Sequence, residues 1–129
     1  MQSPARIVIV EDEQLIAHDL QWRVTRLGYT VVALAATGPE AIQQALTHRP
    51  DFVLMDIRLR GAMDGIEAAA VIRARLDLPV VYLSASVDAM TRACADATHP
   101  AGFLHKPLSD QDLQHTLARA LREALPAAP

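Results

Sequence analysis

Five short apolar segments recur along the chain, each followed by a stretch with helical periodicity, and this alternation constrains the fold most strongly. The segments lie at 7–10, 30–34, 51–55, 80–83 and 102–105. The first is β-branched throughout, which is typical of a strand covered on both faces. Parallel strands need long crossover connections, and the intervening helices would supply them. The sequence therefore predicts a flavodoxin-like, doubly wound α/β fold: a five-stranded parallel sheet of order 2-1-3-4-5 with five helices.

Capping signals place the ends of the expected helices. Thr37 and Glu40 have the spacing of a capping box, Asp64-Gly65 opens a helix that runs to about Leu76, and Ser109 caps the final helix. The fourth helix is alanine-rich and irregular near its end, so we expect it to be short. We expect its apolar side to carry Met90, Ala93, Cys94 and Ala97, with Cys94 packed against the rest of the protein.

Length, charge and cysteine content exclude several classes of protein. A chain of 129 residues fits one domain, expected at 1–125, with 126–129 as a C-terminal tail or truncated linker. The net charge of −3 favours neither direct nucleic-acid binding nor an anionic membrane. Cys94 is the only cysteine, and no apolar run approaches the roughly 20 residues of a membrane span. These features predict a soluble, cytoplasmic protein.

Polar side chains stand where the predicted strands end, which is the edge at which doubly wound sheets bind ligands. Glu11 and Asp12 follow the first strand, Asp56 the third, Ser84 the fourth and Lys106 the fifth. Clustered carboxylates raise one another's pKa unless a cation joins them, and their hard oxygen atoms suit Mg²⁺. Carboxylates, Mg²⁺, an ammonium group and a hydroxyl together suit transfer of a phosphoryl group onto a carboxylate.

Each of these residues also has a simpler interpretation. Glu11 and Asp12 could merely favour the N-terminus of the first helix, where acidic side chains are stabilising. Asp56 could be a loop carboxylate, Ser84 a small residue at a strand end, and Lys106 a solvated surface lysine. The five histidines have no ligand spacing, so we expect them to be surface residues or satisfied by hydrogen bonds. The joint arrangement of the acidic and basic residues favours a functional site.

The order of these motifs resembles the receiver domains of response regulators in two-component signalling, over nearly the whole chain from about Arg6 to Leu121. Each motif alone is weak, but together, at the right strand ends, they are specific. They are Ile9-Val10-Glu11-Asp12-Glu13, Val53-Leu54-Met55-Asp56-Ile57, Asp64-Gly65, Tyr82-Leu83-Ser84-Ala85 and Phe103-Leu104-His105-Lys106-Pro107.

The resemblance implies a role for each matching residue. Asp56 would accept the phosphoryl group, with Ser84 and Lys106 contacting it. The metal site for Mg²⁺ would comprise Glu11, Asp12, Asp56 and the backbone carbonyl of Arg58. Ser84 and Phe103 would be the switch residues, and the Lys106-Pro107 bond is often cis in this family.

The chain departs from the common family pattern in one loop. The segment 58–63, between Asp56 and Asp64-Gly65, is one residue longer than in the commonest members and lacks their proline. Arg58 could lean over the phosphate, and the small Ser86 would leave room for a hydrolytic water. By resemblance these two positions tune the lifetime of the phosphoryl group.

The resemblance implies a phosphorylation-dependent switch rather than an enzyme with an external substrate. A sensor histidine kinase or phosphotransfer protein would be the donor. The face made by the fourth helix, fifth strand and fifth helix would meet an effector protein or a second copy. Two alternatives remain open at this point. One is an aspartyl-nucleophile phosphatase of the haloacid dehalogenase type, which would want an acid where Arg58 stands. The other is a pseudo-receiver that binds partners without being phosphorylated.

Overall fold

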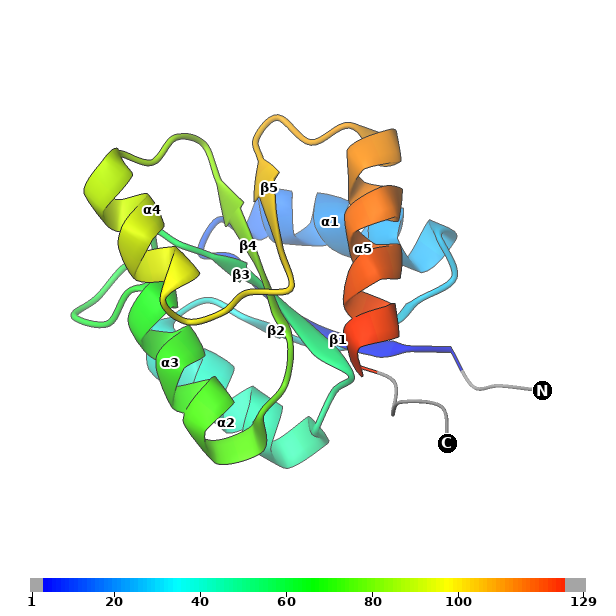
Figure 1. Ribbon diagram of the computed structural model, residues 1–129. Helices are drawn as coiled ribbons and strands as arrows, with labels where there is room; N and C mark the ends of the chain where they lie inside the picture. Colours follow the sequence, from blue (N-terminus) through cyan, green and yellow to red (C-terminus); the bar gives the residue numbers. More distant parts are fainter. Residues whose placement is uncertain (1–3, 125–129) are drawn as a thin grey trace.

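The computed structural model describes residues 4–124, in which five parallel strands alternate with five helices (Figure 1). The strands are hydrogen-bonded in the order β2-β1-β3-β4-β5, so the predicted fold class and strand order are confirmed. The strand bounds are β1 Arg6–Val10, β2 Thr30–Ala35, β3 Phe52–Asp56, β4 Val80–Ser84 and β5 Gly102–His105. The helix bounds are α1 Gln14–Arg26, α2 Gly38–His48, α3 Gly65–Leu76, α4 Ala89–Asp96 and α5 Asp110–Ala124.

Helices cover both faces of the sheet, as the apolar strands require. Figure 1 shows α1 and α5 on one side and α2, α3 and α4 on the other. Alternate residues of β1 and β3 divide between these layers: Ile7 and Leu54 pack toward α1 and α5, whereas Val8 and Met55 pack toward α2 and α3. All four side chains are fully buried. Burial of each such side chain contributes roughly 1.5–3 kcal/mol to the stability of the fold. This central pair of strands therefore holds the segments that follow β1 and β3 in fixed positions.

The predicted helix caps are confirmed at three positions. The Thr37 side chain accepts a hydrogen bond from the Glu40 amide at 3.2 Å, and the Ser109 hydroxyl accepts one from Asp112 at 3.0 Å. Asp64 and Glu67 form a complete capping box at the start of α3. Each such cap typically stabilises a helix by about 1 kcal/mol. The cap at Asp64 also fixes where α3 begins relative to the end of β3.

The predicted orientation of α4 is wrong, although the helix is short, as expected. Its one buried residue is Ala95, whereas Met90 is 79% exposed and Cys94 is exposed. Alanine methyl groups bury little area, so the weak apolar pattern did not determine which side faces inward. Instead, the Arg92 guanidinium stacks over the Phe103 ring, with Cζ 4.1 Å from the ring centroid. The Tyr82 and Thr98 hydroxyls also form a hydrogen bond at 2.6 Å, which ties the end of the α4 segment to β4.

No helix within residues 4–124 is long and apolar enough to cross a membrane. The predicted domain end at residue 125 and the tail at 126–129 lie outside the described residues.

Candidate functional site

Three polar residues are buried among residues 4–124, and all three lie at the carboxyl edge of the sheet. Glu11 follows β1 and is 3% exposed, Asp56 ends β3 and is 6% exposed, and Ser84 ends β4 and is 2% exposed. Parallel pairing of β1 with β3 and of β3 with β4 places these strand ends side by side. Since burying a carboxylate is costly unless it is paired, this edge is the strongest candidate for a functional site.

The predicted carboxylates meet at this edge. Ligand oxygen atoms of Glu11, Asp12 and Asp56 all lie within 4.8 Å of one another. Asp12 is at the mouth, with 16% of its side chain exposed, whereas the other two are set deeper. Three hard oxygen donors, one of them reachable from solvent, match the ligands that Mg²⁺ takes from proteins. The residues present therefore fit a divalent cation.

Lys106 joins the two deeper carboxylates. Its Nζ atom donates to Glu11 Oε2 at 3.0 Å and to Asp56 Oδ2 at 2.9 Å, and its side chain is only 21% exposed. A single ammonium group thus compensates two buried acids that would otherwise repel each other. Lys106 follows β5, beyond β4, and its stem reaches across that strand's end to do so. The interpretation of Lys106 as a solvated surface residue is excluded.

The charges of the cluster perturb its titration. Burial, followed by the neighbouring Asp56 carboxylate, raises the pKa of Glu11 to about 7, although the Lys106 ammonium opposes this. Burial alone would lower the pKa of Lys106, but its hydrogen bonds to Asp56 and Glu11 outweigh that effect and raise it. Without a divalent cation, Glu11 therefore stays partly protonated at neutral pH.

A pH dependence of stability follows from the raised pKa of Glu11. Between pH 4.5 and about 7 the folded protein keeps a proton on Glu11 that the unfolded chain releases, so raising the pH destabilises the fold. Without metal, we expect this group to cost up to about 3 kcal/mol of unfolding free energy across that window. Thermal melts in chelator from pH 5 to 8 measure the loss, and Glu11→Gln should flatten it. Identical slopes for the wild type and Glu11→Gln would contradict the raised pKa.

Asp56 is also held by backbone groups of the loop that follows it. Its Oδ1 atom accepts a hydrogen bond from the Arg58 amide at 3.1 Å, while Lys106 holds Oδ2. The Gly65 amide donates to the Ile57 carbonyl at 2.8 Å, which fixes the first turn of α3 against the end of β3. The two hydrogen bonds from the Arg58 amide and Lys106 therefore fix the orientation of the Asp56 carboxylate. The role of the Arg58 carbonyl as a metal ligand stays a prediction.

Sequence reasoning missed one residue at this edge. The exposed Arg60, two residues beyond Arg58, has its Nε atom 3.6 Å from Asp12 Oδ2. The available signal was the extra residue in the 58–63 loop, whereas the resemblance pointed to Arg58, two residues after Asp56. A loop conformation cannot be derived from length alone, so which arginine meets Asp12 was not predictable.

The two proposed switch residues lie nearby without contacting the carboxylates by hydrogen bonds. The Ser84 hydroxyl donates to the Ser86 carbonyl at 3.1 Å, so it faces the loop after β4. Phe103 on β5 is partly buried, and its ring packs near Tyr82 and His105, with centroids 6.1 and 5.2 Å away. The Lys106-Pro107 bond is cis, as the resemblance implied.

Favourable placement at the N-terminus of α1, the simpler interpretation of Glu11 and Asp12, does not account for their geometry. Glu13 is the N-cap of α1 and forms no side-chain capping bond. The Glu11 Oε1 atom does accept from the Glu13 amide at 3.4 Å, but its other oxygen is bonded to Lys106. The burial of Glu11 beside Asp56 is therefore not explained by helix capping alone.

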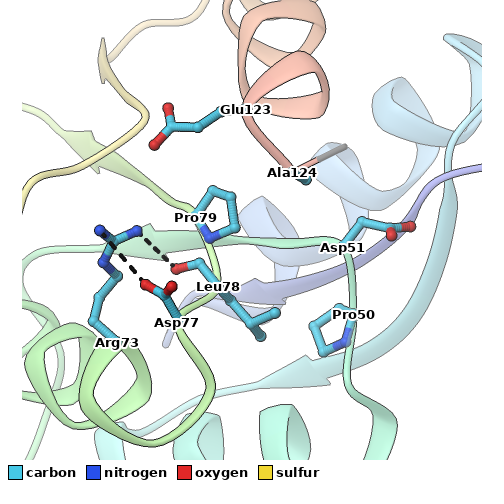
Figure 2. A pocket seen from close by; sticks show the side chains of 8 residues that line it. All are labelled: Pro50, Asp51, Arg73, Asp77, Leu78, Pro79, Glu123 and Ala124. Atoms are coloured by element: carbon cyan, nitrogen blue, oxygen red, sulfur yellow. Dashed lines mark hydrogen bonds and ion pairs between the residues drawn. The ribbon is translucent and has the colours of Figure 1, made fainter. Parts of the chain in front are cut away.

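A pocket of about 440 Å³ opens at the opposite edge of the sheet (Figure 2). Pro50 and Asp51, which precede β3, and Leu78 and Pro79, which precede β4, line it. Within it the Arg73 guanidinium donates to the Leu78 carbonyl at 3.3 Å and lies 4.0 Å from Asp77. These contacts close the turn after α3, so we assign the group a structural role.

Comparison with known proteins gives consistent matches over this fold. The family model of the response regulator receiver domain matches residues 7–118. The transcriptional regulatory protein PdtaR of Mycobacterium tuberculosis is 40% identical over 111 residues, covering 85% of this chain and 53% of that protein. The regulatory protein PhoP of Bacillus subtilis is 30% identical, covering 96% of this chain and 51% of that protein. The chain thus spans about half the length of these two relatives.

Solved structures agree with the sequence matches. The signal receiver domain of a modulated diguanylate cyclase from Desulfovibrio desulfuricans superposes with a TM-score of 0.88 at 36% identity. That match covers 94% of this chain and 96% of the other. The chemotaxis protein CheY4 of Vibrio cholerae superposes with a TM-score of 0.83 at 26% identity, covering 92% and 99%.

Proposed function

Because this chain belongs to the response regulator receiver domain family, we propose that Asp56 is its phosphoacceptor and that the surrounding carboxylates bind Mg²⁺. Receiver domains accept a phosphoryl group in two-component signalling, and the family assignment carries that general role to this chain. The observation that supports Asp56 most directly is its double constraint: Lys106 holds one carboxylate oxygen and the Arg58 amide the other. A nucleophile held in this way needs little reorganisation before attack.

The proposed reaction uses residues of this chain for positioning and charge neutralisation. An Asp56 oxygen attacks the phosphorus of a phosphohistidine, a P–O bond forms, the P–N bond breaks, and the imidazole leaves with the bond's electrons. The Lys106 ammonium, 2.9 Å from Asp56, neutralises charge on the incoming phosphoryl oxygens. When bound, Mg²⁺ would add positive charge near those oxygens. Glu11, Asp12, Asp56 and the Arg58 carbonyl are the proposed metal ligands.

The switch is proposed to run through Ser84 and Phe103. The Ser84 hydroxyl now donates to the Ser86 carbonyl, and rotation would redirect it to a phosphoryl oxygen on Asp56. The loop after β4 would follow, and Phe103 would exchange its contact with Arg92 for a more buried position. This would alter the face made by α4, β5 and α5, where we propose that an effector or a second copy binds.

The partners of receiver domains in general suggest which partners this chain has. Receiver domains interact with histidine kinases and with effector domains. We propose a sensor histidine kinase or phosphotransfer protein as the donor, a cytoplasmic location, and no direct contact with nucleic acid or membrane. The domain would catalyse only its own phosphorylation and dephosphorylation, so we do not propose an enzyme with a separate substrate.

The family assignment argues against one alternative, and the residues of the site argue against the other. The haloacid dehalogenase type of phosphatase would have an acid where Arg58 stands, and the receiver family matches instead. A pseudo-receiver would share the fold but lack a working acceptor. The intact acidic cluster with its bridging lysine argues against that alternative.

Intact-mass measurement tests the proposed chemistry. With Mg²⁺ and acetyl phosphate as a small phosphodonor, the protein should gain the mass of one phosphoryl group. Chelator should prevent the gain, and hydroxylamine should remove it because it attacks acyl phosphates. A label that forms in chelator or survives hydroxylamine would exclude a metal-assisted acyl phosphate.

A further inference from the structure

Two positively charged side chains, Lys106 and Arg60, pair with different carboxylates of the cluster. Lys106 bonds to Glu11 and Asp56, and Asp12 is left to Arg60, whose Nε atom lies 3.6 Å from Asp12 Oδ2. Among the described residues, no other basic side chain forms an ion pair with Asp12. The two pairs differ in exposure, since the Lys106 side chain is 21% exposed and that of Arg60 is 79% exposed. Lys106 is therefore built into the cluster, whereas Arg60 covers it from outside.

The backbone that carries Arg60 is anchored on both sides. Leu59, before it, and Met63, after it, both pack against the core on the α2 and α3 side. Met63 lies directly over Gly38 in the first turn of α2, where no side chain could fit without displacing it. Gly61 has a φ of +100°, a conformation open to glycine, so the chain turns immediately after Arg60. The backbone of Arg60 is therefore held beside the mouth, while its side chain is mostly exposed to solvent.

We propose that Arg60 is a positioning residue that holds Asp12 in the metal-free protein and is displaced when a divalent cation binds. The inference rests on the proposed function in one respect, namely that Asp12 is a metal ligand. An arginine cannot lose its charge at physiological pH, so its guanidinium and a divalent cation compete for the same carboxylate. Arg60 thereby weakens binding of Mg²⁺ and keeps the mouth covered until the cation arrives.

The exposure of the pair limits the size of the effect. Exposed ion pairs shift equilibria by up to about fivefold, because water screens them and side-chain entropy opposes them. We therefore expect Arg60→Gln to tighten Mg²⁺ binding by about twofold to fivefold. Arg60→Lys keeps the charge and should remain within about twofold of the wild type.

Isothermal titration calorimetry with MgCl₂ on the full chain measures the dissociation constants. Arg75→Gln is the matched control, because it removes the same charge from an exposed position at the far end of α3. Circular dichroism melts in chelator check that each variant folds. The inference requires that Arg60→Gln binds more tightly than the wild type and that Arg75→Gln does not. It is overturned if Arg60→Gln binds with unchanged or weaker affinity, or if both variants gain equally.

The same titrations separate this inference from the proposed function. If the wild type shows no binding of Mg²⁺ at millimolar concentration, the carboxylates do not form a metal site. Both the proposed Mg²⁺ site and the role of Arg60 are then wrong. If the wild type binds Mg²⁺ but Arg60→Gln gains nothing, the metal site stands and only the role of Arg60 is wrong.

Discussion

Asp56→Asn is expected to abolish phosphoryl acceptance completely. The substitution keeps the shape of the side chain, but an amide oxygen is a far weaker nucleophile than a carboxylate oxygen and no other carboxylate has the same placement. Glu11 follows β1 rather than ending β3, and Asp12 is at the mouth beside Arg60. The label seen by intact mass with acetyl phosphate and Mg²⁺ in the wild type should therefore be absent from the variant.

Asp112→Asn is the matched control for this experiment. Asp112 is exposed in the first turn of α5, where its side chain has no ion pair among the described residues. It should be phosphorylated like the wild type. A hydroxylamine-sensitive label on Asp56→Asn would place the acceptor elsewhere, with Asp12 and Glu11 the next residues to replace.

Much of this site could be predicted because strand ends are easy to locate. An apolar run predicts a strand, parallel pairing aligns the carboxyl ends, and the polar residue after each run must then lie at one edge. This placed Glu11, Asp12 and Asp56 together, and the structure brings their oxygen atoms within 4.8 Å. The β5 bounds, Gly102–His105, were also predicted correctly.

The direction of long side chains could not be predicted in the same way. Sequence position placed Lys106 near the edge but did not show that its ammonium would join Glu11 to Asp56. Without that link the three carboxylates would repel strongly in the absence of metal. With it, part of the repulsion is already removed, so metal-free destabilisation is smaller than three free carboxylates imply.

Small side chains and loops also limited what could be predicted from the sequence. The orientation of α4 depends on Ala95, on stacking of Arg92 over Phe103 and on one hydroxyl pair, none of which produces a recognisable periodicity. The hydroxyl of Ser84 has low rotational barriers, so its bond to the Ser86 carbonyl is set by local geometry. Both features belong to the region proposed to move, where weak local preferences are expected.

Gly65→Ala is expected to have the largest effect on stability of any single methyl group added near the site. A Cβ atom at Gly65 would overlap the Asp56 carbonyl oxygen and lie 3.0 Å from Ile57 Cα. These are backbone atoms of the strand end, so no side-chain rotation can relieve the clash. The first turn of α3 must move away, and the Gly65–Ile57 hydrogen bond at 2.8 Å would lengthen or break. Overpacking and the lost bond together should cost about 2–4 kcal/mol of unfolding free energy.

The same displacement should also slow phosphorylation, because the added methyl group would shift the backbone of Asp56, the proposed phosphoacceptor. Urea unfolding followed by circular dichroism measures the stability, and the initial rate of labelling by acetyl phosphate measures the chemistry. Gly28→Ala is the control: its φ of +101° makes alanine unfavourable, but nothing lies within 4 Å of an added Cβ. It should cost only about 1–2 kcal/mol and leave the labelling rate unchanged, since only left-handed backbone strain is introduced. Equal effects of the two substitutions on labelling would show that close packing at Gly65 does not position Asp56.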